Sequence, residues 1–216
     1  MRILLPKILA IVFFISLIVP VAASAGTSDE LASLLNHMQT MRAQFTQTIY
    51  DNRGKAIQQS SGSMALMRPG KFRWEVKKPS PQVVIANNQR LWIYDPDLEQ
   101  VTIRSLTSEA GEAPALLLSH ENASLESIYD IQDEHNKQDL HWFTLIPKQK
   151  DNSFASVKMG FDANKALKEM LLQDQIGHST RVQFVKIEMN SKISPDLFNF
   201  KAPAGTDVID ETRPAH

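Results

Sequence analysis

The chain has 216 residues, and 23 lysines and arginines against 24 aspartates and glutamates give it a formal net charge of −1. A nearly neutral chain without long basic blocks is a poor candidate for binding nucleic acid or an anionic membrane surface. It contains no cysteine, which excludes disulfides, thiolate metal sites, cysteine nucleophiles and a lipid anchor on an N-terminal cysteine.

The first residues have the pattern of a secretory signal peptide. Arg2 and Lys7 form a basic start, residues 8–19 form an apolar run, and Ala23-Ser24-Ala25 is a small-x-small cleavage site. The run is shorter than the roughly 17–25 residues that a transmembrane helix needs, and an uncleaved membrane anchor is the alternative. We expect cleavage after Ala25, which removes residues 1–25 and leaves residues 26–216 as one domain outside the cytoplasm.

One amphipathic helix is predicted at the start of the mature chain. Ser28 can cap it, and the acidic residues that follow Ser28 are favourable in a first turn. The apolar residues then recur at helical spacing and lie on one side of about four turns: Leu31, Leu34, Leu35, Met38 and Met41.

From Phe45 the period of the sequence changes to that of β-strands. Short runs recur at close spacing between turn residues, which predicts about ten meandering antiparallel strands, near residues 45–49, 57–66, 72–76, 82–86, 91–94, 100–103, 129–134, 140–146, 156–161, 167–174 and 181–189. Pro114 can start a very apolar helix over 115–118, another turn fits 123–129, and Ser194 can cap one turn before a last extended stretch near Phe200. The fold class is therefore mainly β with short helices: an unclosed antiparallel β-barrel, or strongly curved sheet, covered on one side by helices.

The sequence contains no recognisable catalytic or cofactor motif. None of the six histidines has a close metal-ligand spacing, and neither a serine-nucleophile elbow nor a phosphate-binding glycine loop is present. The neighbouring carboxylates of Asp130, Asp133 and Glu134 are interpreted as solvated polar positions. We therefore expect no catalytic residue, no metal and no cofactor.

Methionines and aromatics are frequent on the predicted strands. Flexible methionines and flat aromatic rings suit adaptable apolar binding, although they can equally fill a barrel core. Both interpretations apply to the whole set: Met64, Met67, Phe72, Trp74, Trp92, Trp142, Met159, Met170 and Met189.

The segment Arg68-Pro69-Gly70-Lys71-Phe72-Arg73-Trp74 resembles the RPxxFxW signature of the periplasmic outer-membrane lipoprotein carriers, the LolA family. Four further segments resemble the family in the same order along the chain. They are the helix-to-strand junction at 45–47, the strand pair 91–101, the apolar lid helix at 114–118 and the C-terminal region 194–203. Ala115 departs from the pattern, because many relatives have an aromatic residue there.

This resemblance implies a soluble, non-enzymatic periplasmic chaperone that carries lipoproteins. It accepts them from an inner-membrane ABC transporter, shields their acyl chains in a hydrophobic cavity and delivers them to an outer-membrane acceptor, as a monomer by default. It also implies that Arg68 ties the barrel to the lid near Leu35, Leu118 and Ser119 by hydrogen bonds to backbone carbonyls. The residues expected at the cavity or its mouth are Phe72, Trp74, Trp92, Leu31, Met38, Met41, Leu116, Leu117 and Leu118.

Three other functions compete with the carrier. The outer-membrane acceptor shares the fold but is itself a lipoprotein that needs an N-terminal cysteine, which this chain lacks. A lipid-responsive periplasmic regulator could use the same scaffold, usually with an extra domain. A periplasmic lipid hydrolase would need a nucleophile or a metal set, and no motif supplies one.

Overall fold

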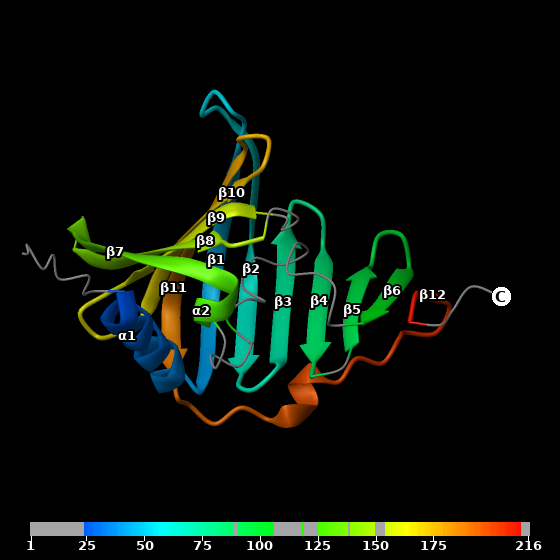
Figure 1. The fold of residues 1–216 in the computed structure, drawn as a ribbon. Helices are drawn as coiled ribbons and strands as arrows, with labels where there is room; N and C mark the ends of the chain where they lie inside the picture. Colours follow the sequence, from blue (N-terminus) through cyan, green and yellow to red (C-terminus); the bar gives the residue numbers. More distant parts are fainter. Residues whose placement is uncertain are drawn as a thin grey trace, which may run out of the picture.

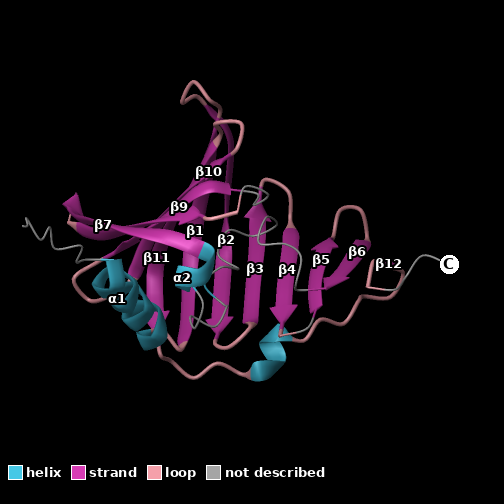
Figure 2. Ribbon diagram, viewed as in Figure 1, coloured by secondary structure: helices cyan, strands magenta, loops and turns pink. Residues whose placement is uncertain are grey.

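A single β-sheet dominates the computed structural model, which describes residues 24–88, 90–105, 118, 125–137, 139–149 and 154–212. Within these ranges the sheet has twelve strands in the order β12-β6-β5-β4-β3-β2-β1-β11-β10-β9-β8-β7, and short helices lie beside it (Figures 1 and 2). The strands are β1 (Thr40–Tyr50), β2 (Ala56–Met67), β3 (Lys71–Lys78), β4 (Gln82–Asn87), β5 (Arg90–Asp95), β6 (Gln100–Ser105), β7 (Tyr129–Lys137), β8 (Leu140–Pro147), β9 (Phe154–Phe161), β10 (Leu167–Asp174), β11 (Ser179–Met189) and β12 (Asp207–Asp210).

The prediction of a mainly β, antiparallel and unclosed fold is confirmed. Neighbouring strands are antiparallel except at one edge, where β12 runs parallel to β6. The sheet is not the strongly curved incomplete barrel that was expected. It is instead one open sheet of twelve strands, in which the edge strands β7 and β12 do not pair with each other.

The N-terminal helix α1 (Ser24–His37) begins and ends earlier than predicted. Ser28 lies inside the helix and is buried, so it is not the cap. Met41 lies on β1, where it pairs with Leu66 of β2 and Met189 of β11. The helix-to-strand junction therefore precedes Thr40 and does not lie at Phe45, because strand pairing on both sides outweighs the local helical spacing.

Helices occupy both faces of the sheet. α1 and the short helix α2 (Leu125–Ile128) lie together with β7, and α2 confirms the turn predicted within 123–129. On the other face the 3₁₀ helix η3 (Pro195–Phe198) contacts β3 and β4, with Ser194 as its cap as predicted. Among the described residues, no helix is long and apolar enough to cross a bilayer.

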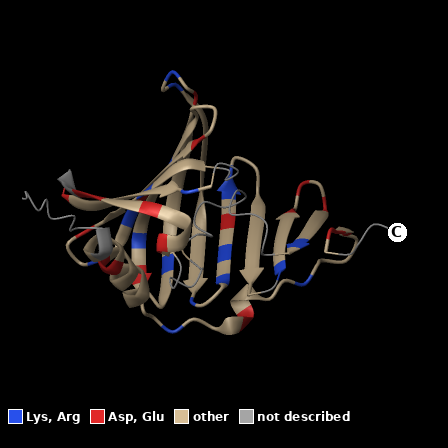
Figure 3. Cartoon of the chain, viewed as in Figure 1, with Lys and Arg blue, Asp and Glu red and all other residues tan. Residues whose placement is uncertain are grey.

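The main core lies on the α1 face of the sheet. We call it the interior cluster: buried apolar side chains from α1, from β1–β5 and β7–β11, and the isolated described residue Leu118. A smaller cluster of Ala65, Ile193 and Phe198 lies on the η3 face. Charged residues of both signs are interspersed over the strands (Figure 3).

The final extended stretch is displaced from its predicted place near Phe200. The last strand is β12, and the Phe200 ring instead packs against Tyr94 with ring centroids 5.4 Å apart. The parallel pairing of β12 with β6 is a long-range contact that local residue patterns do not specify.

Candidate functional site

Arg68 joins the sheet to the interior cluster. It stands in the turn between β2 and β3, and its Nε donates a hydrogen bond of 2.8 Å to the carbonyl oxygen of Leu118. Leu118 is fully buried within the interior cluster. The backbone amide of Arg68 donates to the carbonyl of Gln39, at 2.9 Å, just before β1. One residue thus contacts both the backbone of Gln39, which follows α1, and the backbone of Leu118.

Burial affects the charge of this arginine. Loss of water contact lowers the pKa of the Arg68 guanidinium to about 10. The side chain therefore still carries its charge at neutral pH, but at a desolvation cost that opposes the hydrogen bond to Leu118.

The turn that carries Arg68 is fixed by Gly70. Its φ of +67° is a left-handed conformation that glycine adopts without steric cost. A Cβ at this position would also collide with the side chain of Asn88. The backbone N–H of Asn88 donates to the Gly70 carbonyl at 2.8 Å. This hydrogen bond holds the β2–β3 turn against the end of β4. The backbone that carries Arg68 is therefore fixed in position.

Stacked aromatic rings form the centre of the interior cluster. The rings of Phe45 and Trp74 lie parallel with centroids 3.6 Å apart, and the Phe72 ring is 6.1 Å from that of Trp74. Phe184 meets Trp74 edge-on at 6.4 Å. Gly62 makes this stack possible, because a Cβ there would collide with the Phe45 ring and with the neighbouring backbone of β3.

Methionines contribute much of the remaining apolar lining. Five of them are buried in the interior cluster: Met38, Met41, Met64, Met159 and Met170. Their unbranched side chains have several rotatable bonds and can repack around a guest of irregular shape.

Most of the described residues predicted for the cavity come together in the interior cluster. They are Leu31, Leu35, Met38, Met41, Phe72, Trp74 and Leu118. Leu116, Leu117 and Ser119 lie outside the described residues. The functions predicted for these residues, lid locking and contact with acyl chains, stay predictions.

Trp92 is the exception. Leu91 and Ile93 on the same strand face the interior cluster, so the alternation of β5 directs Trp92 to the opposite face, where it pairs with Ile85. The prediction that Trp92 borders the same interior as Trp74 does not fit this register. Tryptophan is apolar enough for either face, and residue type alone could not decide between them.

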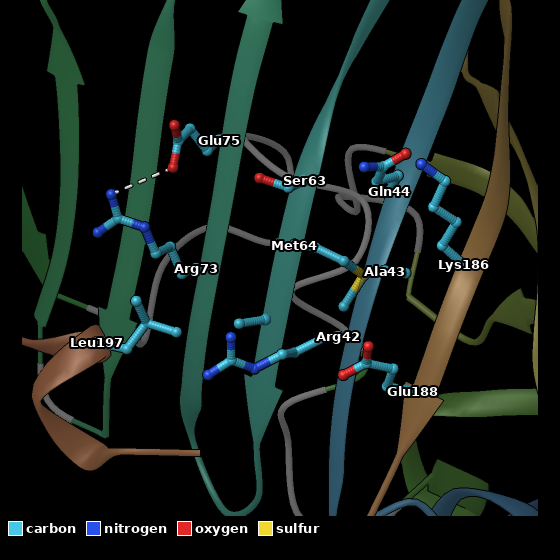
Figure 4. A pocket seen from close by; sticks show the side chains of 11 residues that line it. Arg42, Ala43, Gln44, Ser63, Met64, Arg73, Glu75, Lys186, Glu188 and Leu197 are labelled. Carbon is cyan, nitrogen blue, oxygen red and sulfur yellow. Dashed lines mark hydrogen bonds and ion pairs between the residues drawn. The ribbon is translucent and has the colours of Figure 1, made fainter. Parts of the chain in front are cut away.

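A polar groove lies on the face opposite the aromatic stack, and sequence reasoning missed it (Figure 4). Its volume is about 340 Å³, and its walls come from β1, β2, β3, β11 and η3. Arg73 and Glu75 alternate on β3 with Phe72 and Trp74, and they form a 3.4 Å ion pair. Because Arg42, Lys186 and Glu188 add charges of both signs, the groove has no strong preference for one sign.

One group of possible metal ligands exists among the described residues. Glu30, Asp133 and His141 offer three ligand atoms within 4.8 Å of one another, where α1 meets β7 and β8. Spacing motifs could not reveal this group, because its members belong to three elements that are far apart in the sequence.

Comparisons with known proteins agree with one another. The family model described as outer membrane lipoprotein carrier protein LolA matches residues 36–201. An outer-membrane lipoprotein carrier protein of Dechloromonas aromatica (strain RCB) is 39% identical over 194 residues, which cover 90% of this chain and 92% of the relative. One of Methylococcus capsulatus is 40% identical over 192 residues, 88% of this chain and 91% of the relative. In fold, the chain is similar to an uncharacterized conserved protein of Thermus thermophilus, with a TM-score of 0.54, 11% identity, and coverage of 84% of this chain and 99% of that one.

Proposed function

Because the chain belongs to the LolA family of outer membrane lipoprotein carrier proteins and carries such lipoproteins, we propose that it shelters the acyl chains of its cargo in the interior cluster, under α1 and the segment that contains Leu118. In this proposal residues 1–25 are removed after Ala25, and residues 26–216 work as one domain in the periplasm. An inner-membrane ABC transporter supplies the lipoprotein, and an outer-membrane acceptor receives it. The chain performs no chemistry on its cargo.

The observation that carries this proposal is the connection between Arg68 and Leu118. A carrier needs apolar surface that is hidden when empty and available when loaded. Leu118 is fully buried, and among the described residues its carbonyl accepts a hydrogen bond from the Arg68 side chain instead of from a neighbouring strand. We propose that the predicted lid segment 114–118 opens at this hydrogen bond and acts as a movable cover for the interior cluster.

Energetics explain why such a cover is needed. Each methylene removed from water contributes roughly 0.8 kcal/mol, so one acyl chain with about 15 methylenes contributes about 12 kcal/mol. Two or three such chains in a rigid, permanently open cavity would bind too tightly for release. The side chains of the interior cluster are buried against one another in this structure, so loading must separate some of them. That separation opposes binding and makes handover possible.

A reconstituted transfer assay tests the proposal. Mature protein with Arg68→Leu is compared with wild type and with Arg104→Leu, a control that removes an arginine on β6, next to the β12 edge of the sheet, where it pairs with Glu211. We expect Arg68→Leu to take up lipoprotein from transporter-containing vesicles but to deliver or recycle poorly, since its cover no longer returns to the closed position. Arg104→Leu should deliver normally. Normal delivery by Arg68→Leu would show that the hydrogen bond between Arg68 and Leu118 does not control release of the cargo.

Native mass spectrometry of protein purified from its host envelope tests the carrier function itself. Bound lipoprotein of defined mass is the expected result. A protein that is always empty, and that instead hydrolyses lipid esters or binds a regulatory partner, would contradict the proposal.

A further inference from the structure

His141 connects the N-terminal helix to the edge of the sheet. It lies on β8, with Asp133 of β7 on one side of its ring and Glu30 of α1 on the other. Nε2 is 2.8 Å from Asp133 Oδ1, and Nδ1 is 3.6 Å from Glu30 Oε1. The imidazole also packs on Phe143, with centroids 4.4 Å apart, and Phe143 is fully buried in the interior cluster. The ring is therefore held from three sides.

The short contact determines which nitrogen carries the hydrogen. A carboxylate only accepts hydrogen bonds, so the 2.8 Å contact requires Nε2–H to donate to Asp133. In the neutral imidazole Nδ1 then presents an electron pair, and this pair faces the Glu30 carboxylate. A divalent cation placed between Nδ1 and Glu30 would accept an electron pair from each of them.

The spacing of these two donors fits a metal ion. At 3.6 Å, Nδ1 and Glu30 Oε1 are farther apart than the roughly 2.7–3.2 Å of a hydrogen bond. Zinc holds histidine nitrogen and carboxylate oxygen at about 2.0–2.2 Å, so two such ligands at a tetrahedral angle are about 3.4 Å apart. A carboxylate that accepts from the other ring nitrogen, as Asp133 does, is the usual partner of a metal-binding histidine.

We propose that Glu30, Asp133 and His141 form a binding site for Zn²⁺ or a similar divalent transition-metal ion. His141 Nδ1 and Glu30 are the direct ligands, Asp133 fixes the orientation of the ring, and water completes the coordination. Nitrogen and carboxylate donors together favour zinc over the hard cations Mg²⁺ and Ca²⁺. Bound metal fastens α1 to β7 and β8, and so restrains the N-terminal helix that covers the interior cluster.

Calorimetric titration of metal-free mature protein with ZnCl₂ tests the site. We expect one ion per chain, at least tenfold weaker binding in His141→Gln, and a loss of roughly 10- to 100-fold in Asp133→Asn, the size typical of an orienting partner. His178→Gln is the matched control, since His178 also faces a carboxylate, with Nδ1 3.1 Å from Asp174, but on the β10–β11 hairpin. This control should bind zinc as wild type does.

A second measurement separates a metal site from a merely structural histidine. Zinc should slow hydrogen exchange in the Glu30 region of α1 in wild type and not in His141→Gln. Unchanged zinc affinity in His141→Gln, an equal loss in His178→Gln, or zinc binding without slower exchange in α1 would overturn the proposal. No lipoprotein is needed for these measurements, so their failure leaves the carrier function untouched.

Discussion

Replacing Arg68 with leucine should release the cover without unfolding the protein. The reason lies in two opposing contributions of this side chain. Burial lowers the pKa of Arg68 to about 10, and at 1.36 kcal/mol per pKa unit this fall corresponds to a desolvation cost of about 3 kcal/mol. The side chain is only partly buried, so solvent screening reduces this cost to about 2 kcal/mol.

The hydrogen bond to Leu118 offsets nearly the same amount. A hydrogen bond from a charged donor contributes about 1.5–3 kcal/mol, and this one is 2.8 Å long. The two contributions almost cancel. We therefore expect Arg68→Leu to change the free energy of unfolding by about 1 kcal/mol or less, which corresponds to a melting-temperature shift of about 4 °C or less.

Circular dichroism during urea unfolding measures the stability, and hydrogen exchange around Leu118 measures the cover. Exchange there should become faster in Arg68→Leu, while the paired strands β2 and β3 keep their protection. A loss of about 3 kcal/mol or more, well above the net effect of one charged hydrogen bond, would refute the reasoning, because Arg68 would then be an anchor of the fold. Unchanged exchange at Leu118 would refute it as well, since the bond would then hold nothing.

Two other predictions concern the two faces of the sheet. Trp74→Ala should weaken lipoprotein uptake strongly in the vesicle assay, because it removes the ring at the centre of the aromatic stack. Trp92→Ala, a matched truncation on the opposite face, should leave uptake unchanged, and equal losses in both would show that the face assignment is wrong. Gly62→Ala should lower the free energy of unfolding by about 1–3 kcal/mol, measured by urea unfolding, because its Cβ would collide with the Glu75 backbone on β3 and with the Phe45 ring. Wild-type stability would contradict the close approach of β3 and Phe45 to Gly62.

Most of the sheet could be predicted because local signals specify it. The alternation on β3 placed Phe72 and Trp74 on one face, and turn residues such as Gly70 marked where strands end. Arg68 could be singled out because it stands in such a turn within a motif that resembles a known family. The structure then places it against Leu118, a contact across the fold.

What could not be predicted depends on long-range pairing. Met41 has helical spacing to Met38, and only its partners on β2 and β11 reveal that it lies on a strand. Trp92 has the composition of a cavity residue, but the register of β5 directs it to the other face. Glu30, Asp133 and His141 come from three separate elements, so no local sequence pattern indicates that they lie together.

The central claim is that acyl chains enter the interior cluster and contact Trp74. Single-tryptophan variants make this measurable, since the chain has three tryptophans. One variant keeps Trp74 and carries Trp92→Phe and Trp142→Phe; the other keeps Trp92 and carries Trp74→Phe and Trp142→Phe. Both are loaded with a lipoprotein whose acyl chains carry bromine, which quenches tryptophan fluorescence only at close range. Compared with unbrominated cargo, brominated cargo should strongly quench the fluorescence of Trp74 and leave that of Trp92 unchanged. Quenching of Trp92 but not of Trp74 would contradict the central claim.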